Sequence, residues 1–175
     1  MSKTGELTHF SDSGRARMVD VSEKLNSLRT AIASGVLRLL PATQERIRAG
    51  MIAKGDVLAV ADVAAVMAAK RTAEMIPMCH LLPLSGVDVQ FCDVSEPDGD
   101  GCVGIKVSVT VQCVGPTGVE MEALCAVNVA LLTIYDMCKA IDRGMYIESV
   151  RLEEKHGGRS GTWRREKTVY GRETK

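Results

Sequence analysis

Apolar and polar residues alternate along two neighbouring stretches in the middle of the chain, at 87–92 and 103–114. This period of two is typical of half-buried β-strands. In the second stretch the apolar residues fall on one strand face: Ile105, Val107, Val109 and Val111. Residues 95–101 between them are rich in Gly, Pro and Asp, which favour turns. The pattern predicts a β-hairpin with a long, exposed tip.

Other segments have the period of a helix or the composition of a buried strand. Residues 119–143 carry apolar side chains at helical spacing and end at Gly144, which predicts a long helix lying on a sheet. Residues 41–50 begin with a proline and end with a glycine, as a short helix does. The alanine-rich residues 57–72 follow Asp56, a good N-cap, and predict a third helix. Two further stretches are predicted strands, at 28–40 and 145–153.

The order of these elements is strand, helices, strand, strand, helix, strand. It predicts an α+β fold of the ferredoxin-like (split βαβ) type, an antiparallel sheet with helices on one face. The other sheet face then lacks a cover, and we expect its apolar residues to favour oligomerisation. We expect a flexible arm at residues 1–18, a single domain at 19–161 and a charged, mobile tail at 162–175.

Composition and charge narrow the classes of function. The 175 residues contain 22 Lys or Arg and 22 Asp or Glu, so the net charge is zero. A chain with no net charge lacks the overall electrostatic attraction on which non-specific binding to nucleic acids and anionic membranes depends. Only 3% of the residues are aromatic, which disfavours a base-stacking surface.

Targeting signals and cysteine usage point to a cellular compartment. Residues 1–10 contain no apolar run of the kind found in signal peptides. The apolar stretches at 57–69 and 123–134 are each interrupted by a polar residue, and we judge them too short to span a bilayer. None of the six cysteines forms a Cys-x-x-Cys pair, so we expect reduced thiols that serve mainly as small buried side chains. We therefore expect a cytoplasmic protein without a nucleic-acid or membrane partner.

Charged residues lie near both ends of the long predicted helix. Glu120 and Glu122 lie in its first turn, where the helix dipole favours carboxylates; this alone is a sufficient structural reason for Glu120. Asp136 and Lys139 are three residues apart and so share one helical face. An exposed ion pair would explain them, but the apolar residues around them favour a half-buried pair whose pKa values suit proton transfer. Glu122 and Asp136 are about 21 Å apart along a helix, so either they have different roles or a neighbouring subunit brings them together.

Three other segments carry candidate chemistry. Lys54, in a Lys-Gly-Asp string before a helix, suits an anionic ligand, although a solvated lysine fits the same spacing. His80, on a loop after a proline, suits acid–base work or metal ligation, but no convincing further zinc ligands accompany it. Residues 155–161 place glycines around cations, which fits either a loop that closes on phosphates or a frayed tail.

Six strings, read together, resemble the MoaC family of molybdenum cofactor biosynthesis, and the resemblance runs from about Leu7 to Gly161. They are MVDVS at 18–22, AAKRT at 68–72, IPMCH at 76–80, TGVEMEAL at 117–124, LTIYDMCKA at 132–140 and GGRSG at 157–161. The resemblance implies ferredoxin-like hexamers, trimers of dimers, with active sites between subunits. It also implies conversion of a cyclised dihydroguanosine triphosphate to a cyclic pyranopterin monophosphate with release of diphosphate, without a metal or other cofactor.

The resemblance also assigns roles to individual residues. It implies a catalytic set of Asp136, Lys139, Lys54, His80, Glu120 and Glu122. The substrate-binding residues it implies are Met78, Cys79, His80, Met121, Glu122, Arg29 and Lys155. Arg29, Lys54 and Lys155 would then neutralise the triphosphate. His80 and a Lys139 whose pKa is lowered by burial would move protons, with Asp136 orienting Lys139 or acting as a base.

The sequence departs from the family pattern at two places. Leu81 and Leu82 follow His80 where the family usually has proline and leucine, and Pro116 stands where a basic residue is common. We expect these departures to affect loop shape and one phosphate contact. Two competing classes are a non-catalytic module that binds a small ligand, and a zinc-dependent cyclohydrolase that opens GTP with His80 and cysteines.

Overall fold

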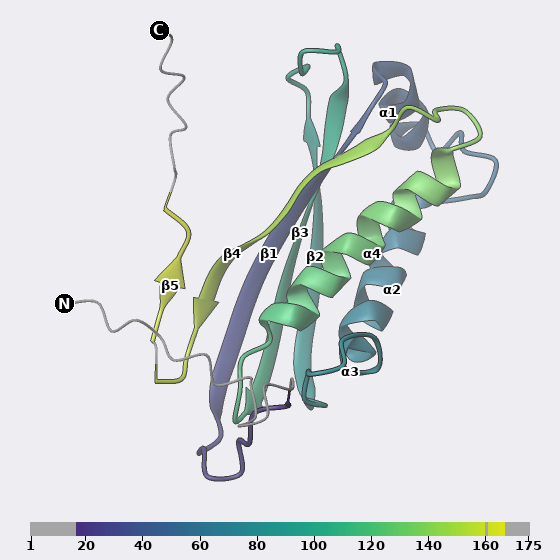
Figure 1. The fold of residues 1–175 in the computed structure, drawn as a ribbon. Helices are drawn as coiled ribbons and strands as arrows, with labels where there is room; N and C mark the ends of the chain where they lie inside the picture. The colour runs from purple at the N-terminus through teal and green to yellow at the C-terminus, as the bar shows by residue number, and fades with distance from the viewer. Residues whose placement is uncertain (1–16, 160, 167–175) are drawn as a thin grey trace, which may run out of the picture.

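The computed structural model describes residues 17–159 and 161–166, so most of the predicted arm and tail lie outside the described residues. Its elements follow the predicted order and are shown in Figure 1. The strands are β1 (Ser27–Leu39), β2 (Leu84–Val94), β3 (Val103–Gly115), β4 (Tyr146–His156) and β5 (Trp163–Arg164). The helices are α1 (Pro41–Arg48), α2 (Val57–Lys70), α3 (Thr72–Met75) and α4 (Glu120–Cys138).

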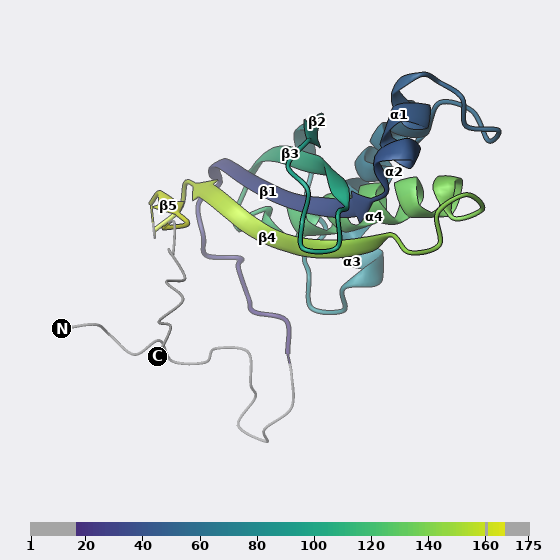
Figure 2. The ribbon, with the colours of Figure 1, turned by 90° about the horizontal axis from the view of Figure 1, so that it is seen from above.

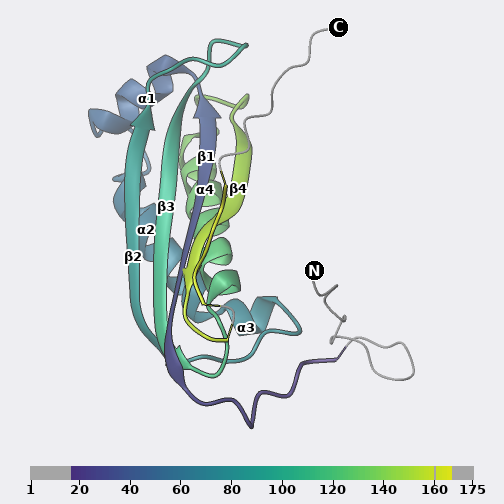
Figure 3. The same cartoon turned by 90° about the vertical axis from the view of Figure 1, so that its left-hand side faces the viewer.

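The strands form one antiparallel sheet in the order β2-β3-β1-β4-β5. β3 separates β1 from β2, and β1 separates β3 from β4, so each helical connection crosses over one intervening strand. This is the split βαβ arrangement, which confirms the predicted α+β class. Figure 3 shows the open face of the sheet, with α2 and α4 behind it, and Figure 2 shows the helices on one side of the strands.

The core lies between the sheet and α4. Alternate residues of β1 and β3 point to the helices and are buried, and in β3 this confirms the predicted period of two. Gly35 in β1 lets α4 approach closely, since a Cβ at this position would lie 2.8 Å from Leu131 Cδ1 and 2.8 Å from the Ser149 carbonyl oxygen. A side chain at this position would therefore separate α4 from β1.

The helix α2 begins where the sequence predicted. Asp56 is its N-cap, and the carboxylate accepts the Ala59 backbone N–H at 3.0 Å. Ala61, Ala65 and Ala69 recur every four residues and are buried in the core. Because these side chains are small, α2 packs closely against α4.

The predicted end of the long helix at Arg143 is wrong, because α4 ends at Cys138. The Cys138 carbonyl oxygen accepts the N–H groups of both Ile141 and Asp142, which form a tight turn. Asp142 is then buried, and its carboxylate accepts the backbone N–H of Leu40 at 2.8 Å. This contact, between residues far apart in the sequence, replaces the last predicted helical turn.

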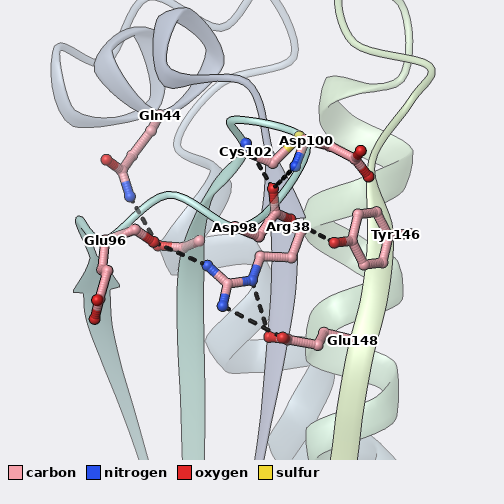
Figure 4. Close-up of polar contacts among 9 residues, drawn as sticks. Arg38, Gln44, Glu96, Asp98, Asp100, Cys102, Tyr146 and Glu148 are labelled. Atoms are coloured by element: carbon pink, nitrogen blue, oxygen red, sulfur yellow. Dashed lines mark hydrogen bonds and ion pairs between the residues drawn. The ribbon is translucent and has the colours of Figure 1, made fainter. Parts of the chain in front are cut away.

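The hairpin tip between β2 and β3 is tied to two other strands, as Figure 4 shows. The carboxylate of Asp98 accepts the N–H groups of Asp100 and Cys102, each at 2.9 Å, and the hydroxyl of Tyr146 on β4. Arg38 on β1 donates to the Glu96 carbonyl oxygen at 3.2 Å and pairs with Glu148 at 2.9 Å. The predicted turn is thus present and is held by contacts with β1 and β4.

The expectation of an apolar open sheet face is wrong. The even-numbered residues of β1 and β3 point away from the helices, and most of them are polar. In register with their neighbours on β2, the polar residues of this face are Thr30, Ser34, Arg38, Asp88, Gln90, Lys106, Ser108, Thr110 and Gln112. The apolar residues of β1 and β3 on this face are Leu28, Ile32, Val36 and Val114; the exposed pair Leu28 and Val114 lies at one end, and Ile32 and Val36 lie among polar neighbours. They do not form one large apolar patch, so this face gives only a weak hydrophobic argument for oligomers.

The end of the described chain also differs from the expectation. Residues 163 and 164, placed in the predicted tail, form β5 and pair with Lys155 and Glu154 of β4. The sheet therefore extends beyond the predicted domain boundary at residue 161.

Two other expectations need correction. By length and composition α4 is long and apolar enough to cross a membrane, contrary to the sequence argument, but it packs on the sheet beside α2 as a core helix. All six cysteines are free, and only Cys113 and Cys138 are fully buried, whereas Cys92 is exposed.

Candidate functional site

The C-terminal end of α4 carries a cluster of three charged residues. Lys54, from the loop before α2, donates to the Asp136 carboxylate at 2.9 Å and to the Asp136 carbonyl oxygen at 2.7 Å. Lys139 lies one helical turn after Asp136 and pairs with its other carboxylate oxygen at 2.6 Å. Asp136 thus bridges two lysines that are 85 positions apart in the sequence. We call Lys54, Asp136 and Lys139 the lysine cluster.

The lysine cluster is exposed in the single chain. Solvent reaches 46% of the Lys54 side chain, 56% of Asp136 and 53% of Lys139. Hydrogen bonds from Lys139 and then Lys54 lower the pKa of Asp136 to about 2, and the hydrogen bond with Asp136 raises the pKa of Lys139. The expectation of a half-buried pair with a lowered Lys139 pKa is therefore wrong for this chain, because a carboxylate neighbour stabilises the ammonium form.

A different environment surrounds the N-terminal end of α4. A cavity of about 420 Å³ lies between the start of α4, the loop after α3 and residues 19–24. It brings together predicted site residues from two distant strings, and they are Met78, Cys79, His80, Glu120, Met121 and Glu122. The His80 ring nitrogen Nε2 lies 2.9 Å from the Val19 carbonyl oxygen, which holds the ring against the segment before β1.

Glu122 is buried at the wall of this cavity, with 4% of its surface exposed. Burial, with a smaller contribution from the charge of Glu120, raises the pKa of Glu122 above its usual range. Burial and the nearby Glu122 charge likewise raise the pKa of the Cys79 thiol. Glu122 therefore binds a proton more tightly than an ordinary carboxylate, whereas Cys79 is a poor nucleophile.

A second cavity, of about 760 Å³, adjoins the first, and Lys24, Thr117, Gly118 and Glu120 line both. Its lining contains four cations, Lys24, Arg29, Lys155 and Arg159, with His156 beside them, and two carboxylates, Glu23 and Glu120. Lys155 lies 3.2 Å from the Glu120 carboxylate. We call this the cationic cavity, and its charge suits a polyanionic group such as a phosphate chain.

Backbone contacts fix Arg29 in the wall of the cationic cavity. Its guanidinium donates to the carbonyl oxygens of Gly115 at 3.3 Å and Pro116 at 3.2 Å. Gly158 has a φ of +74°, and a Cβ at this position would lie 1.6 Å from Arg29 Nη1, so a side chain here would be strained and would displace the guanidinium. Pro116, where the family pattern commonly has a basic residue, contributes its carbonyl oxygen to the same wall.

The structure joins the predicted residues into two groups, one at each end of α4, and does not bring the groups together within one chain. Met78, Cys79, His80, Met121, Glu120, Glu122, Arg29 and Lys155 line the two adjoining cavities. Lys54, Asp136 and Lys139 form the lysine cluster.

The sequence argument missed Lys24, Thr117 and His156 in the cavity walls. Thr117 is the first residue of the 117–124 string and His156 directly precedes the 157–161 string, whereas Lys24 carries no signal beyond its position shortly after the 18–22 string. In the described part of the chain, no group of three or more His, Cys, Asp and Glu is arranged to hold a metal ion.

A cationic cavity that adjoins a buried carboxylate and a histidine has the composition of a small-molecule site, with charge suited to a polyanion. The model of the MoaC family matches residues 18–158. This chain therefore belongs to the MoaC family.

Relatives named cyclic pyranopterin monophosphate synthase match almost the whole chain. The protein of Thermomicrobium roseum is 58% identical over 161 residues, which cover 92% of this chain and 94% of the relative. That of Limosilactobacillus fermentum is 57% identical over 155 residues, or 89% and 90% of the two chains. That of Listeria monocytogenes is 54% identical over 161 residues, or 92% and 97%.

Proposed function

We propose that this chain converts (8S)-3′,8-cyclo-7,8-dihydroguanosine 5′-triphosphate to cyclic pyranopterin monophosphate, with release of diphosphate, in molybdenum cofactor biosynthesis. It is then a lyase whose substrate is a small molecule derived from a purine nucleotide. The observation that carries this proposal is the joining of the cationic cavity to the cavity of Glu122 and His80 through shared walls. The names of relatives with more than half of their residues identical support the same reaction.

The two cavities divide the chemistry between them. Lys24, Arg29, Lys155 and Arg159 neutralise the triphosphate and stabilise the diphosphate that leaves. Opening the nucleobase and closing the pterin ring both require proton transfer. His80 and the buried Glu122 lie in the adjoining cavity, where they can exchange protons with the rearranging base, and Met78, Cys79 and Met121 form the wall against it. No metal ion or other cofactor takes part in this scheme.

The lysine cluster enters the reaction from a second subunit in this proposal. Asp136 and Glu122 are separated by about 21 Å of helix, too far for one small substrate to contact both. Lys54, Asp136 and Lys139 are exposed, as residues that complete a neighbour's site would be before assembly. These two observations support active sites between subunits of a homo-oligomer. The resemblance to the family suggests a hexamer built as a trimer of dimers, and the sequence argument suggests that it lies in the cytoplasm.

The reaction itself is tested with the purified full-length chain and the cyclised nucleotide. Diphosphate release and pterin formation are followed together, the first by a coupled phosphate assay and the second by mass spectrometry. We expect one diphosphate for each pterin. Absence of both products above a control without protein would contradict the proposal.

The shared site is tested by mixing two inactive variants, Asp136→Ala and His80→Ala, after subunit exchange. If each site takes its lysine cluster from one subunit and its cavities from another, about a quarter of the sites in an equal mixture contain no substitution. Activity should return to that fraction. A mixture as inactive as its components, or a fully active monomer in analytical ultracentrifugation, would rule out the shared site.

A further inference from the structure

The described end of the chain is attached to the strand that leads into the cationic cavity. Residues 161–166, which we call the strap, run antiparallel to the end of β4 through β5. Arg165 donates its backbone N–H to the Glu153 carbonyl oxygen and its Nε to the Leu152 carbonyl oxygen, both at 2.8 Å. The strap is therefore held by backbone pairing as well as by side chains (Figure 1).

Glu154 contacts residues on both sides of the turn between β4 and β5. Its carboxylate oxygen Oε1 accepts from Arg164 Nε of the strap at 2.6 Å and lies 2.7 Å from His156 Nε2 at the end of β4. The other ring nitrogen of His156 lies 3.1 Å from the Thr162 hydroxyl. Only 19% of the Glu154 side chain is exposed, so these contacts are partly shielded from solvent.

The segment held in this way supplies several groups of the cationic cavity. Lys155 directly follows Glu154, and Gly157, Gly158 and Arg159 follow in the same wall. Gly157 and Gly158 have φ of +96° and +74°, and added Cβ atoms would lie 2.2 Å from the Leu28 carbonyl oxygen and 1.6 Å from Arg29 Nη1. This backbone therefore lies close against Arg29, and a side chain at Gly158 would displace the guanidinium.

We propose that Arg164 and Glu154 are positioning residues for phosphate binding: their ion pair holds the segment that presents Lys155 and Arg159 and presses on Arg29. The inference rests on the proposed function, in which these cations bind the triphosphate. Two glycines with positive φ make the segment costly to order, and anchoring it before the ligand arrives removes that cost from binding.

Arg164→Ala tests the proposal. Each charge-assisted contact to phosphate contributes to the binding free energy, and the variant should misplace the cations that make these contacts. We therefore expect KM for the cyclised nucleotide to rise about 10-fold and kcat to change less than about 2-fold. Binding of inorganic diphosphate, measured by calorimetry, should weaken to the same extent. Arg164→Lys keeps the charge and should recover most of the affinity.

A matched control is Arg48→Ala, which removes an exposed ion pair with Asp93 at 2.7 Å beside α1, away from the strap. The Arg164 side chain is 73% exposed although its partner Glu154 is shielded, and both partners of the Arg48 pair are exposed. Ion pairs made by such solvated side chains contribute little to stability, so both alanine variants should melt like the unsubstituted protein. Equal KM and equal diphosphate affinity in Arg164→Ala and Arg48→Ala would overturn the proposal.

A double-variant cycle shows whether Arg164 acts through the cations. In a Lys155→Ala background the effect of Arg164→Ala on diphosphate affinity should shrink, because one of the groups that the strap positions has gone. An undiminished effect would also overturn the proposal. The diphosphate measurement needs no turnover, so a chain that fails to form the pterin but shows these affinities contradicts the proposed function and not the role of the strap.

Discussion

The two ends of α4 carry the same kinds of residue in opposite surroundings. At its start, Glu122 is 4% exposed beside a cavity and its pKa is raised; near its end, more than half of the Asp136 side chain is exposed and its pKa is lowered to about 2. Burial without a cation favours the neutral carboxyl, whereas two lysines favour the carboxylate. Environment, and not residue type, therefore suits Glu122 to carry a proton and Asp136 to hold a charge.

The comparison also separates the two sets of cations. Lys155 and Arg29 lie in the walls of a cavity and are held by contacts with several strands and loops. Lys54 and Lys139 are both held by one carboxylate on the surface. We infer that the first set recognises the phosphates of a ligand that enters the cavity, whereas the second completes its site only when another subunit covers it.

The largest expected effect is at Lys139. Lys139→Ala should lower kcat by at least about 100-fold, the scale of general acid–base catalysis, because the ammonium group that donates the proton is lost. Lys139→Arg should fail as well, since a guanidinium holds its proton more tightly than an ammonium group and presents it from a planar fork of different shape. Single-turnover kinetics on the cyclised nucleotide measure both effects, and thermal melts check that the variants fold. Near-normal turnover in Lys139→Arg would show that charge alone suffices at this end of α4.

A smaller effect should separate the two sets of cations. Lys155→Ala should raise KM about 10-fold and weaken the binding of inorganic diphosphate, because it removes a charge from the cationic cavity. Lys54→Ala should weaken binding of the cyclised nucleotide, but should leave diphosphate affinity unchanged in a monomeric form of the protein, since Lys54 is outside that cavity. Both affinities should fall as salt is added. Loss of diphosphate affinity in the Lys54 variant alone would reverse the assignment of the two ends.

The charge of Asp136 should be visible in the pH profile. Its carboxylate raises the pKa of Lys139, so Asp136→Asn should lower that pKa towards the ordinary value for lysine. Lys139 would then lose its proton at a lower pH, and the alkaline limb of the residual kcat profile should move to lower pH. An alkaline limb that stays in place or moves to higher pH would mean that Asp136 does not control Lys139.

The smallest effect concerns stability at the buried end. Because the pKa of Glu122 is raised in the folded protein, its contribution to stability is present below the ordinary carboxyl pKa, near 4.3, and is lost as the pH rises through the raised value. Glu122→Gln cannot ionise, so at pH 7 its Tm should be higher than that of the unsubstituted protein by about 2–4 °C. The difference should vanish at about pH 4. A Tm difference that is the same at both pH values would mean that the buried carboxyl does not titrate as described. The kcat of the variant should be lower than that of the unsubstituted protein at either pH.

Local patterns in the sequence determined the elements and their order. The period of two in β3, the N-cap at Asp56 and the proline at the start of α1 depend on residues within a few positions of one another, and all three predictions are confirmed. The strings around Glu122 and Asp136 also indicate the family without any information on tertiary contacts. The distance of about 21 Å between these two residues follows from helix geometry alone, because α4 is continuous.

Only the tertiary structure decided the surroundings of those residues. Two contacts join segments that are distant in the sequence: the pairing of Lys54 with Asp136 and the contact of Gly158 with Arg29. The exposure of Lys139 depends on which elements cover that part of the surface. The polar open face of the sheet and the early end of α4 have the same origin, since strand register and the Asp142 contact with Leu40 set them. Periodicity reports which side of an element is apolar, but charge, burial and pKa depend on which other elements pack there, and that is fixed only when the chain folds.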